Sequence, residues 1–279
     1  MPEIPDKIFS QFDESFNPED SKRYSLVIEV ERKKFSYSLL DIGKNKFVGV
    51  GFLCQQFNEV INSISWIRNA FHSKRIIIAN SRSTLIPAAL FSQEEKQDYL
   101  DFNMEREKDD VVLYDWLENL GIYNIYSIPG QLKNDIHEFF PDAKLCHVSS
   151  VLMESLYVNF KNLMGVGKMF VNVRDEEFDL MIFAGKHLNY FNSFPFKAPE
   201  DLAYYLIFVM EQMNMNPEET SLVLVGETDK KSDIYDLLFR YIRNIDFAGR
   251  NETFNYSYAL NDIPAHFYYT LFNSEQCGL

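Results

Sequence analysis

The sequence predicts an α/β protein of two halves, each repeating one plan of three meandering strands, an amphipathic helix and a buried strand. The plan runs from Tyr24 to Ala79 and again from Lys168 to Val225. Short polar connectors between the first three strand-like runs indicate antiparallel hairpins. A helix followed by a continuous apolar run indicates a crossover to a parallel strand. We therefore expect two mixed five-stranded sheets with flanking helices.

The first half opens with strand-like runs at Tyr24–Val30, Phe35–Leu40 and Phe47–Leu53. A helix is expected next, because apolar residues recur with helical spacing, namely Phe57, Val60, Ile61, Ile64, Ile67 and Phe71. The run Arg75–Ala79 is short and almost entirely apolar, which is typical of a strand buried on both faces.

Residues 80–110 break this pattern, and we interpret them as an insertion that includes a helix near Gln93–Phe102. Strand-like runs follow at Val111–Tyr114 and Ile122–Ile128, and a helix is expected to begin at Pro129, since proline suits the first helical position.

The second half repeats the order, with strand-like runs at Lys168–Val173, Phe178–Ala184 and His187–Phe194. Pro199, followed by two acids, marks a helix start, because acids favour the positive end of the helix dipole. Ser221–Val225 is the second buried strand. Three segments result: an N-terminal arm over 1–23, a first half over 24–164 with the insertion near 80–110, and a second half over 165–279.

The composition indicates which kinds of molecule the protein is expected to bind and in which cellular compartment. The chain has 279 residues with 41 acids and 27 Lys and Arg, a net charge of −14 that disfavours nucleic acid. The three cysteines are scattered and odd in number, which is typical of reduced thiols. The start of the sequence lacks the features of a signal peptide, and no apolar stretch is long enough to span a membrane. We expect a cytoplasmic protein without direct membrane insertion.

The stretch Val111–Leu156 carries a family resemblance. It contains the runs Pro129-Gly130-Gln131, Phe139-Phe140-Pro141-Asp142-Ala143 and Cys146-His147-Val148-Ser149-Ser150. With the repeated element order, it resembles the actin-like ATPase superfamily, the duplicated ribonuclease-H-like fold of actin, Hsp70 and sugar kinases. It looks most like a bacterial family of unknown function with that fold. It is also similar to the cytoplasmic actin-like subunits of type IV pilus and type II secretion assemblies. The resemblance covers about residues 20–275 and implies a cleft between the halves.

The chemistry of that superfamily is tested by two turns. Members that hydrolyse ATP carry an Asp-x-Gly turn between the first two strands of each half, where the carboxylate holds Mg²⁺ and glycine lets backbone N–H groups close on phosphate. Here the turns read Glu29–Lys34 and Asn172–Glu177, and neither contains glycine. Glu29 or Glu31 in the first turn and Asp175 in the second are the candidate vestigial metal ligands, with Glu31 and Asp175 as the cleft positions, and ordinary solvated hairpins are the alternative.

A third segment matches better. The resemblance places the adenosine-binding segment at Gly226 and Glu227, before a helix that Ser232 is expected to cap. Nucleotide-binding families usually have two glycines there, and this chain has one. Gly226 fits equally well as a strand-to-helix turn that needs a positive φ.

These observations favour a non-catalytic actin-like scaffold or protein-interaction module with a degenerate nucleotide cleft. No catalytic residue, metal site or cofactor is expected. The alternative is a residual ATP-binding or ATP-hydrolysing enzyme, for which Mg-ATP would be the cofactor.

A partner surface is expected at the third strand of the second half, which this fold leaves at a sheet edge. It carries Tyr190, Phe191 and Phe194, and an open edge with clustered rings suits strand addition or a homodimer. In the alternative interpretation these rings pack under the helix that begins at Pro199 and under the aromatic tail.

Overall fold

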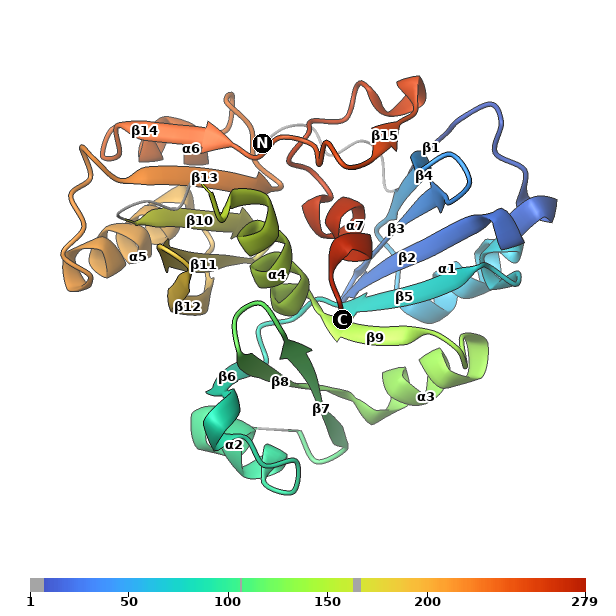
Figure 1. The fold of residues 1–279 in the computed structure, drawn as a ribbon, viewed down its shortest axis with the longest axis horizontal. Helices are drawn as coiled ribbons and strands as arrows, with labels where there is room; N and C mark the ends of the chain where they lie inside the picture. The colour runs from blue at the N-terminus through green and yellow to red at the C-terminus, as the bar shows by residue number, and fades with distance from the viewer. Residues whose placement is uncertain (1–7, 106, 163–166) are drawn as a thin grey trace. The chain divides into compact units, whose positions relative to one another are not determined.

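The computed structural model describes residues 8–105, 107–162 and 167–279, which form two compact units (Figure 1). The amino-terminal unit contains the described part of 5–155, together with Asn251–Asp262 and Thr270–Leu279. The carboxy-terminal unit contains the described part of 156–250, together with Ile263–Tyr269. The expected boundary after residue 164 lies outside the described residues. The tail differs from the expected division, because most of it returns to the amino-terminal unit.

The amino-terminal unit is built on a mixed sheet of seven strands in the order β1-β4-β3-β2-β5-β9, with β15 paired to β4. Its strands are β1 (Ile8–Phe12), β2 (Tyr24–Glu31), β3 (Lys34–Asp41), β4 (Lys46–Leu53), β5 (Ser73–Ile78), β9 (Lys144–His147) and β15 (Asn255–Tyr256). The hairpins β2–β3 and β3–β4 are antiparallel, whereas β5 lies parallel to β2 and β9 parallel to β5.

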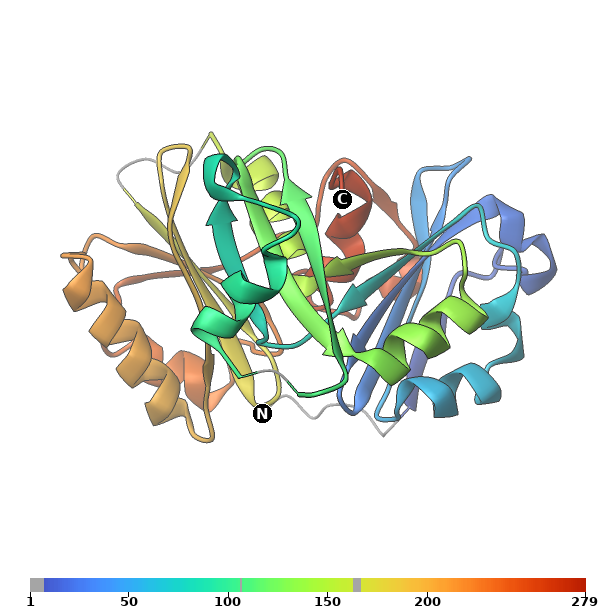
Figure 2. The same ribbon diagram turned by 90° about the horizontal axis from the view of Figure 1, so that it is seen from below.

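Helices cover both faces of this sheet. The helices α1 (Phe57–Ser63) and α3 (Gly130–Phe139) lie on one face (Figure 2), where the apolar side chains of α1 and Ile136 of α3 join the core of the sheet. The short helix α7 (Tyr269–Asn273) contacts the opposite face, since the phenyl rings of Phe47 and Phe272 pack edge to face at 4.9 Å. The expected helical stripe is therefore part of the core, although its last third continues as a 3₁₀ turn.

Two strands of this sheet were not anticipated. The segment Ile8–Phe12 was expected within a surface arm, but it pairs antiparallel with β4, and the ring of Phe12 stacks on Phe16 at 4.8 Å. The strand β15 comes from the tail and pairs with the other end of β4. Aromatic burial accounts for the second case, because the rings of Phe254 and Tyr256 both pack on Phe47.

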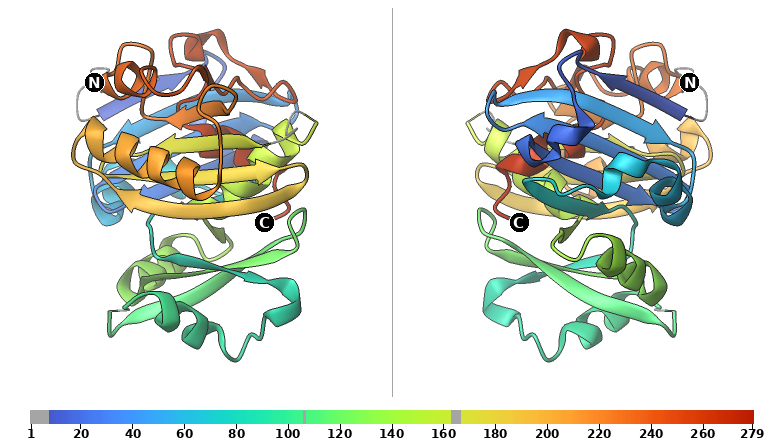
Figure 3. Two further views of the ribbon diagram at one scale, coloured as in Figure 1. Left: turned by 90° about the vertical axis from the view of Figure 1, so that its left-hand side faces the viewer. Right: turned by 90° about the vertical axis from the view of Figure 1, so that its right-hand side faces the viewer.

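The insertion is larger than expected. A separate three-stranded sheet, in the order β6-β8-β7, is formed by β6 (Ser83–Pro87), β7 (Asp110–Leu117) and β8 (Ile122–Pro129). The helix α2 (Lys96–Asn103) packs on it through Leu100 and a small apolar cluster (Figure 3). The strand-like runs expected after residue 110 therefore belong to the insertion rather than to the repeated core.

The carboxy-terminal unit contains a five-stranded sheet in the order β12-β11-β10-β13-β14. Its strands are β10 (Lys168–Val173), β11 (Glu177–Ala184), β12 (His187–Pro195), β13 (Ser221–Gly226) and β14 (Asn244–Phe247). The helices α5 (Pro199–Gln212) and α6 (Asp233–Leu238) bury apolar side chains against one face of it. The helix α4 (Val148–Phe160) precedes this sheet in the chain.

The strand order confirms the predicted duplication. The series β4-β3-β2-β5-β9 of the first sheet corresponds to β12-β11-β10-β13-β14 of the second, with the same antiparallel and parallel pairs. One detail differs from expectation. The third strand lies at the sheet edge only in the carboxy-terminal unit, because β4 is flanked by β1 and β15 in the other.

Candidate functional site

The turn between β10 and β11 is organised around an ion pair. The backbone N–H of Arg174 donates to the carbonyl oxygen of Glu177 at 2.9 Å, which closes the hairpin. The guanidinium Nη2 of Arg174 lies 3.1 Å from Oδ1 of Asp179 and 3.1 Å from Oε2 of Glu177. The only cation of this turn is therefore already neutralised by carboxylates of its own hairpin.

The carboxylate of Asp179 is fully buried and fully engaged. Besides Arg174, it accepts hydrogen bonds from Ser193 Oγ at 2.6 Å and from Asn172 Nδ2 at 2.9 Å. Burial raises the pKa of Asp179, but the charge of Arg174 and these hydrogen bonds outweigh that effect and hold the pKa below its ordinary value. Removing one partner of such a buried pair costs roughly 3–5 kcal/mol, because the other charge stays buried.

Gly226 ends β13 in a conformation and a space that only glycine fits. Its φ is +84°, and a Cβ built there would lie 2.2 Å from the carbonyl oxygen of Val173 and 2.7 Å from Oδ1 of Asn172. Its own N–H donates to the carbonyl oxygen of His266, and the next N–H, of Glu227, donates to Val173 at 2.7 Å. Both N–H groups are thus engaged within the chain.

The loop after Gly226 is held by a second set of hydrogen bonds. Ser232 caps α6, as predicted, by accepting from the backbone N–H of Tyr235 at 3.2 Å. The hydroxyls of Thr228 and Ser232 lie 2.8 Å apart, and His266 Nε2 lies 2.6 Å from the carbonyl oxygen of Thr228. Burial lowers the pKa of His266, which favours the neutral imidazole. This loop is fixed by contacts within its own unit.

Two of the predicted residues lie together in one small cavity. Asp175 and Glu227 line a cavity of about 130 Å³ in the carboxy-terminal unit, with Asp233 as a third acid and Arg174 and Lys197 as bases. Ligand pockets usually occupy roughly 300–1,000 Å³. A cavity of this size, with an acidic lining, is poorly suited to a nucleoside triphosphate.

Glu31 lies elsewhere, at the end of β2, and lines a groove of about 400 Å³ in the amino-terminal unit. The apolar side chains that line the groove include Phe57 and Leu132. Asp135 also lines it, and its carboxylate accepts hydrogen bonds from Asn58 Nδ2 at 2.7 Å and from a glutamine side chain of α3 at 2.6 Å. This groove presents polar and apolar groups side by side.

The residues expected at the partner surface divide between the two faces of β12. Tyr190 and Phe194 pack against the core of the unit, and the ring of Phe194 stacks on Tyr205 of α5 at 4.6 Å. Phe191 points to the opposite face, since side chains alternate along a strand. In the described part of the chain, β12 pairs with β11 alone and so leaves one edge of its backbone open.

A buried polar network escaped the sequence analysis. The carboxylate of Asp115 accepts from the backbone N–H of His147 at 2.8 Å, and Nδ1 of that histidine lies 2.7 Å from Ser149 Oγ. Asn124 donates to Ser149 Oγ at 2.9 Å. Burial raises the pKa of Asp115 to about 6. The available signal was the presence of polar residues, Asp115 and Asn124, within strands that are otherwise largely apolar.

Two negative findings apply to the described residues alone. Among them, no group of three or more His, Cys, Asp and Glu side chains is arranged to hold a metal ion. Over the same ranges, no helix has the length and apolar character that crossing a membrane requires.

Comparison with known proteins places the chain in a family. The family model described as "Protein of unknown function (DUF3822)" matches residues 13–245, which is most of the chain. No curated protein matches the sequence significantly.

Two solved structures show the fold. A Bacteroides thetaiotaomicron protein described as having an actin-like ATPase fold and unknown function aligns with a TM-score of 0.74 and 23% identity, over 84% of this chain and 93% of that one. A chain of the PilM-PilN type IV pilus biogenesis complex aligns with a TM-score of 0.61 and 11% identity, over 90% of this chain and 98% of that one. The chain therefore has an actin-like ATPase fold, as its sequence predicted.

Proposed function

This chain belongs to the DUF3822 family of proteins of unknown function, and we propose that it is a non-catalytic protein-interaction module with a degenerate nucleotide site. The proposal concerns the carboxy-terminal unit first, because its turn and its Gly226 loop are the segments that resemble phosphate- and adenosine-binding elements. A cytoplasmic location is part of the proposal, since Cys54, Cys146 and Cys277 are all free thiols.

One observation carries the proposal: the N–H groups of Gly226 and Glu227 and the guanidinium of Arg174 are engaged by their own unit. Phosphate binding at a tight turn requires backbone N–H groups that point at the ligand and a cation that is available to it. Here the N–H of Gly226 donates to His266, the N–H of Glu227 donates to Val173, and Arg174 is paired with Asp179. The same segments thus stabilise the unit instead of presenting donors to a ligand.

Two observations support a protein as the partner. The chain of similar fold described above comes from the PilM-PilN type IV pilus biogenesis complex, so that chain has a protein as its partner. The net charge of −14 opposes binding to nucleic acid and favours a basic partner. The open edge of β12, with Phe191 on one face, is one surface through which this chain would pair with a partner or a second copy.

Titration of the full chain with Mg-ATP tests the proposal. A ligand that binds the native state raises its stability by RT ln(1 + [L]/Kd), about 2.7 kcal/mol at a hundredfold excess over Kd. We expect no saturable rise in the unfolding temperature at millimolar Mg-ATP and no release of phosphate. A saturable rise that disappears in Glu227→Arg, but persists in Glu138→Arg on α3, would instead support the residual ATP-binding enzyme.

A further inference from the structure

The helix α5 has two apolar stripes, and only one of them faces the core. Leu202, Leu206 and Val209 are buried against the sheet of the carboxy-terminal unit. Tyr204 and Phe208 belong to the second stripe, and they are 64% and 47% exposed. A surface helix usually has one apolar stripe and a charged face, so a helix with a second stripe generally packs against something else.

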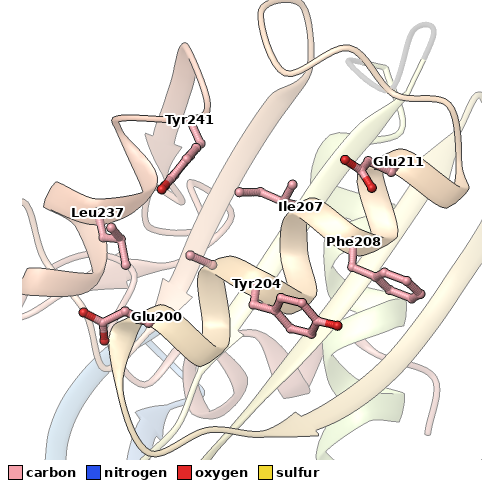
Figure 4. Close-up of a pocket in the computed structure, with 8 residues that line it drawn as sticks. Glu200, Tyr204, Ile207, Phe208, Glu211, Leu237 and Tyr241 are labelled. Carbon is pink, nitrogen blue, oxygen red and sulfur yellow. The ribbon is translucent and has the colours of Figure 1, made fainter.

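The second stripe forms one wall of a groove. The groove has a volume of about 410 Å³, and its eight lining residues come from α5 and from the segment that begins with α6. They are Glu200, Ala203, Tyr204, Ile207, Phe208, Glu211, Leu237 and Tyr241. Figure 4 shows Ile207 of α5 directed toward Leu237 and Tyr241, whereas the rings of Tyr204 and Phe208 project from the outer side of the helix. The rings of Tyr204 and Phe208 stack with their centroids 6.3 Å apart.

The charges of the groove are of one sign. Glu200 and Glu211 lie toward its two ends on α5 (Figure 4), and none of the eight lining residues is basic. Neither α5 nor α6 contains a lysine or an arginine, although Arg240 is the second residue after α6. Glu211 follows Glu200 by eleven positions on the helix, which corresponds to about 16 Å along the axis.

We propose that this groove binds a basic amphipathic helix of a partner protein. Apolar side chains of such a helix, spaced at i, i+3 or i+4 and i+7, would lie between the walls, and lysines or arginines near its ends would meet Glu200 and Glu211. A second copy of this chain fits less well, because a two-fold contact would bring equivalent glutamates together on proteins that each carry −14. An anionic membrane surface is disfavoured for the same electrostatic reason.

The proposal adds a surface and a partner type to the proposed function, and its test does not involve nucleotide. If the peptide below does not bind, the prediction for Mg-ATP is unaffected. If Mg-ATP does bind, the prediction for the groove is unaffected.

The experiment measures the affinity of the full chain for a labelled synthetic helix of about 14 residues, with leucines on one face and lysines elsewhere, by fluorescence anisotropy. A scrambled peptide of identical composition controls for non-specific attraction to an acidic protein. We expect the amphipathic peptide to bind at least tenfold more tightly than the scrambled one. We also expect affinity to fall at least tenfold in Tyr204→Ser and in the double variant Glu200→Lys, Glu211→Lys.

The matched control is Tyr258→Ser, since Tyr258 is 60% exposed but belongs to the amino-terminal unit and is not one of the residues that line the groove. It should bind the peptide as the parent does. Equal affinity for both peptides, or an unchanged affinity in Tyr204→Ser, would overturn the proposal. So would a parent that is dimeric in solution and becomes monomeric in Tyr204→Ser, because the groove would then hold a second copy. Circular dichroism of each variant confirms that it is folded.

Discussion

The substitution Gly226→Ala tests whether Gly226 is required by the structure of its own unit or is kept free to face a ligand. Gly226 has a φ of +84°, and its missing Cβ would meet the backbone of Val173 at 2.2 Å. Gly185, in the turn between β11 and β12, provides a matched control, because its φ is +60° and nothing lies within 4 Å of a built Cβ. The two variants share the backbone penalty and differ in the clash.

The expected costs follow from these geometries. A non-glycine residue in the left-handed region lowers the free energy of unfolding by roughly 1–2 kcal/mol. Alanine also restricts the unfolded chain, which raises the free energy of unfolding by about 0.4–1 kcal/mol. Gly185→Ala should therefore cost about 1 kcal/mol. In Gly226→Ala the carbonyl of Val173 must also move away, which breaks its hydrogen bond from the N–H of Glu227. An unsatisfied buried carbonyl adds roughly 1–3 kcal/mol, so the total should be about 3 kcal/mol.

Urea denaturation followed by far-ultraviolet circular dichroism measures both costs. Tryptophan fluorescence is unsuitable, since Trp66 and Trp116 both lie in the amino-terminal unit. If the two variants lose the same free energy of unfolding within about 0.5 kcal/mol, the backbone around Gly226 has room for a side chain. The loop after Gly226 would then not be closed by contacts within its own unit.

Three further predictions concern charge and packing. Asp179→Asn should cost about 3 kcal/mol at pH 7, because it removes the buried carboxylate that lies 3.1 Å from the buried guanidinium of Arg174. Since the native pKa of Asp179 is lowered, that stability is present above its ordinary pKa and is lost below about pH 4, so the variant should lose less stability on acidification than the parent. The native pKa of Asp115 is raised to about 6, so the free energy of unfolding of the parent should fall as the pH rises from about 4 to 6. In Asp115→Asn, urea denaturation should show a flatter dependence of this free energy on pH, and an unchanged dependence would contradict the role given to Asp115. Phe194→Lys should lower the free energy of unfolding by about 2 kcal/mol, because the ring of Phe194 packs on α5, whereas Phe191→Lys should stay within about 1 kcal/mol of the parent. Equal unfolding temperatures for the two variants would show that the two faces of β12 do not differ.

The local patterns of this chain were sufficient to predict the repeated plan. Strand alternation, the single stripe of Phe57 and Val60, and the apolar runs at β5 and β13 each reflect contacts between near neighbours in sequence. Hairpins and helix crossovers then admit few topologies. The strand order common to both sheets follows from these constraints, which is why it was predictable without coordinates.

The candidate site was predictable only in part. The absence of glycine from both turns was visible in the sequence, and so was the position of Gly226 at the end of a strand. The pairing of Arg174 with Asp179 was not, because it depends on the register of β10 against β11, which places Asn172 opposite Asp179. The shared cavity of Asp175 and Glu227 depends likewise on two segments brought together by the sheet.

The sequence by itself determined the fold class, the duplication and the glycine-free turns, because periodicity and turn chemistry are local properties. Tertiary structure alone decided where β1 and β15 attach, since a short strand gains its stability from a partner far away in the chain. The helical spacing of Leu202, Leu206 and Val209 was enough to predict the buried stripe of α5. The exposure of Tyr204 and Phe208 was decided by the tertiary structure, because the exposure of an apolar side chain depends on which distant segments pack over it.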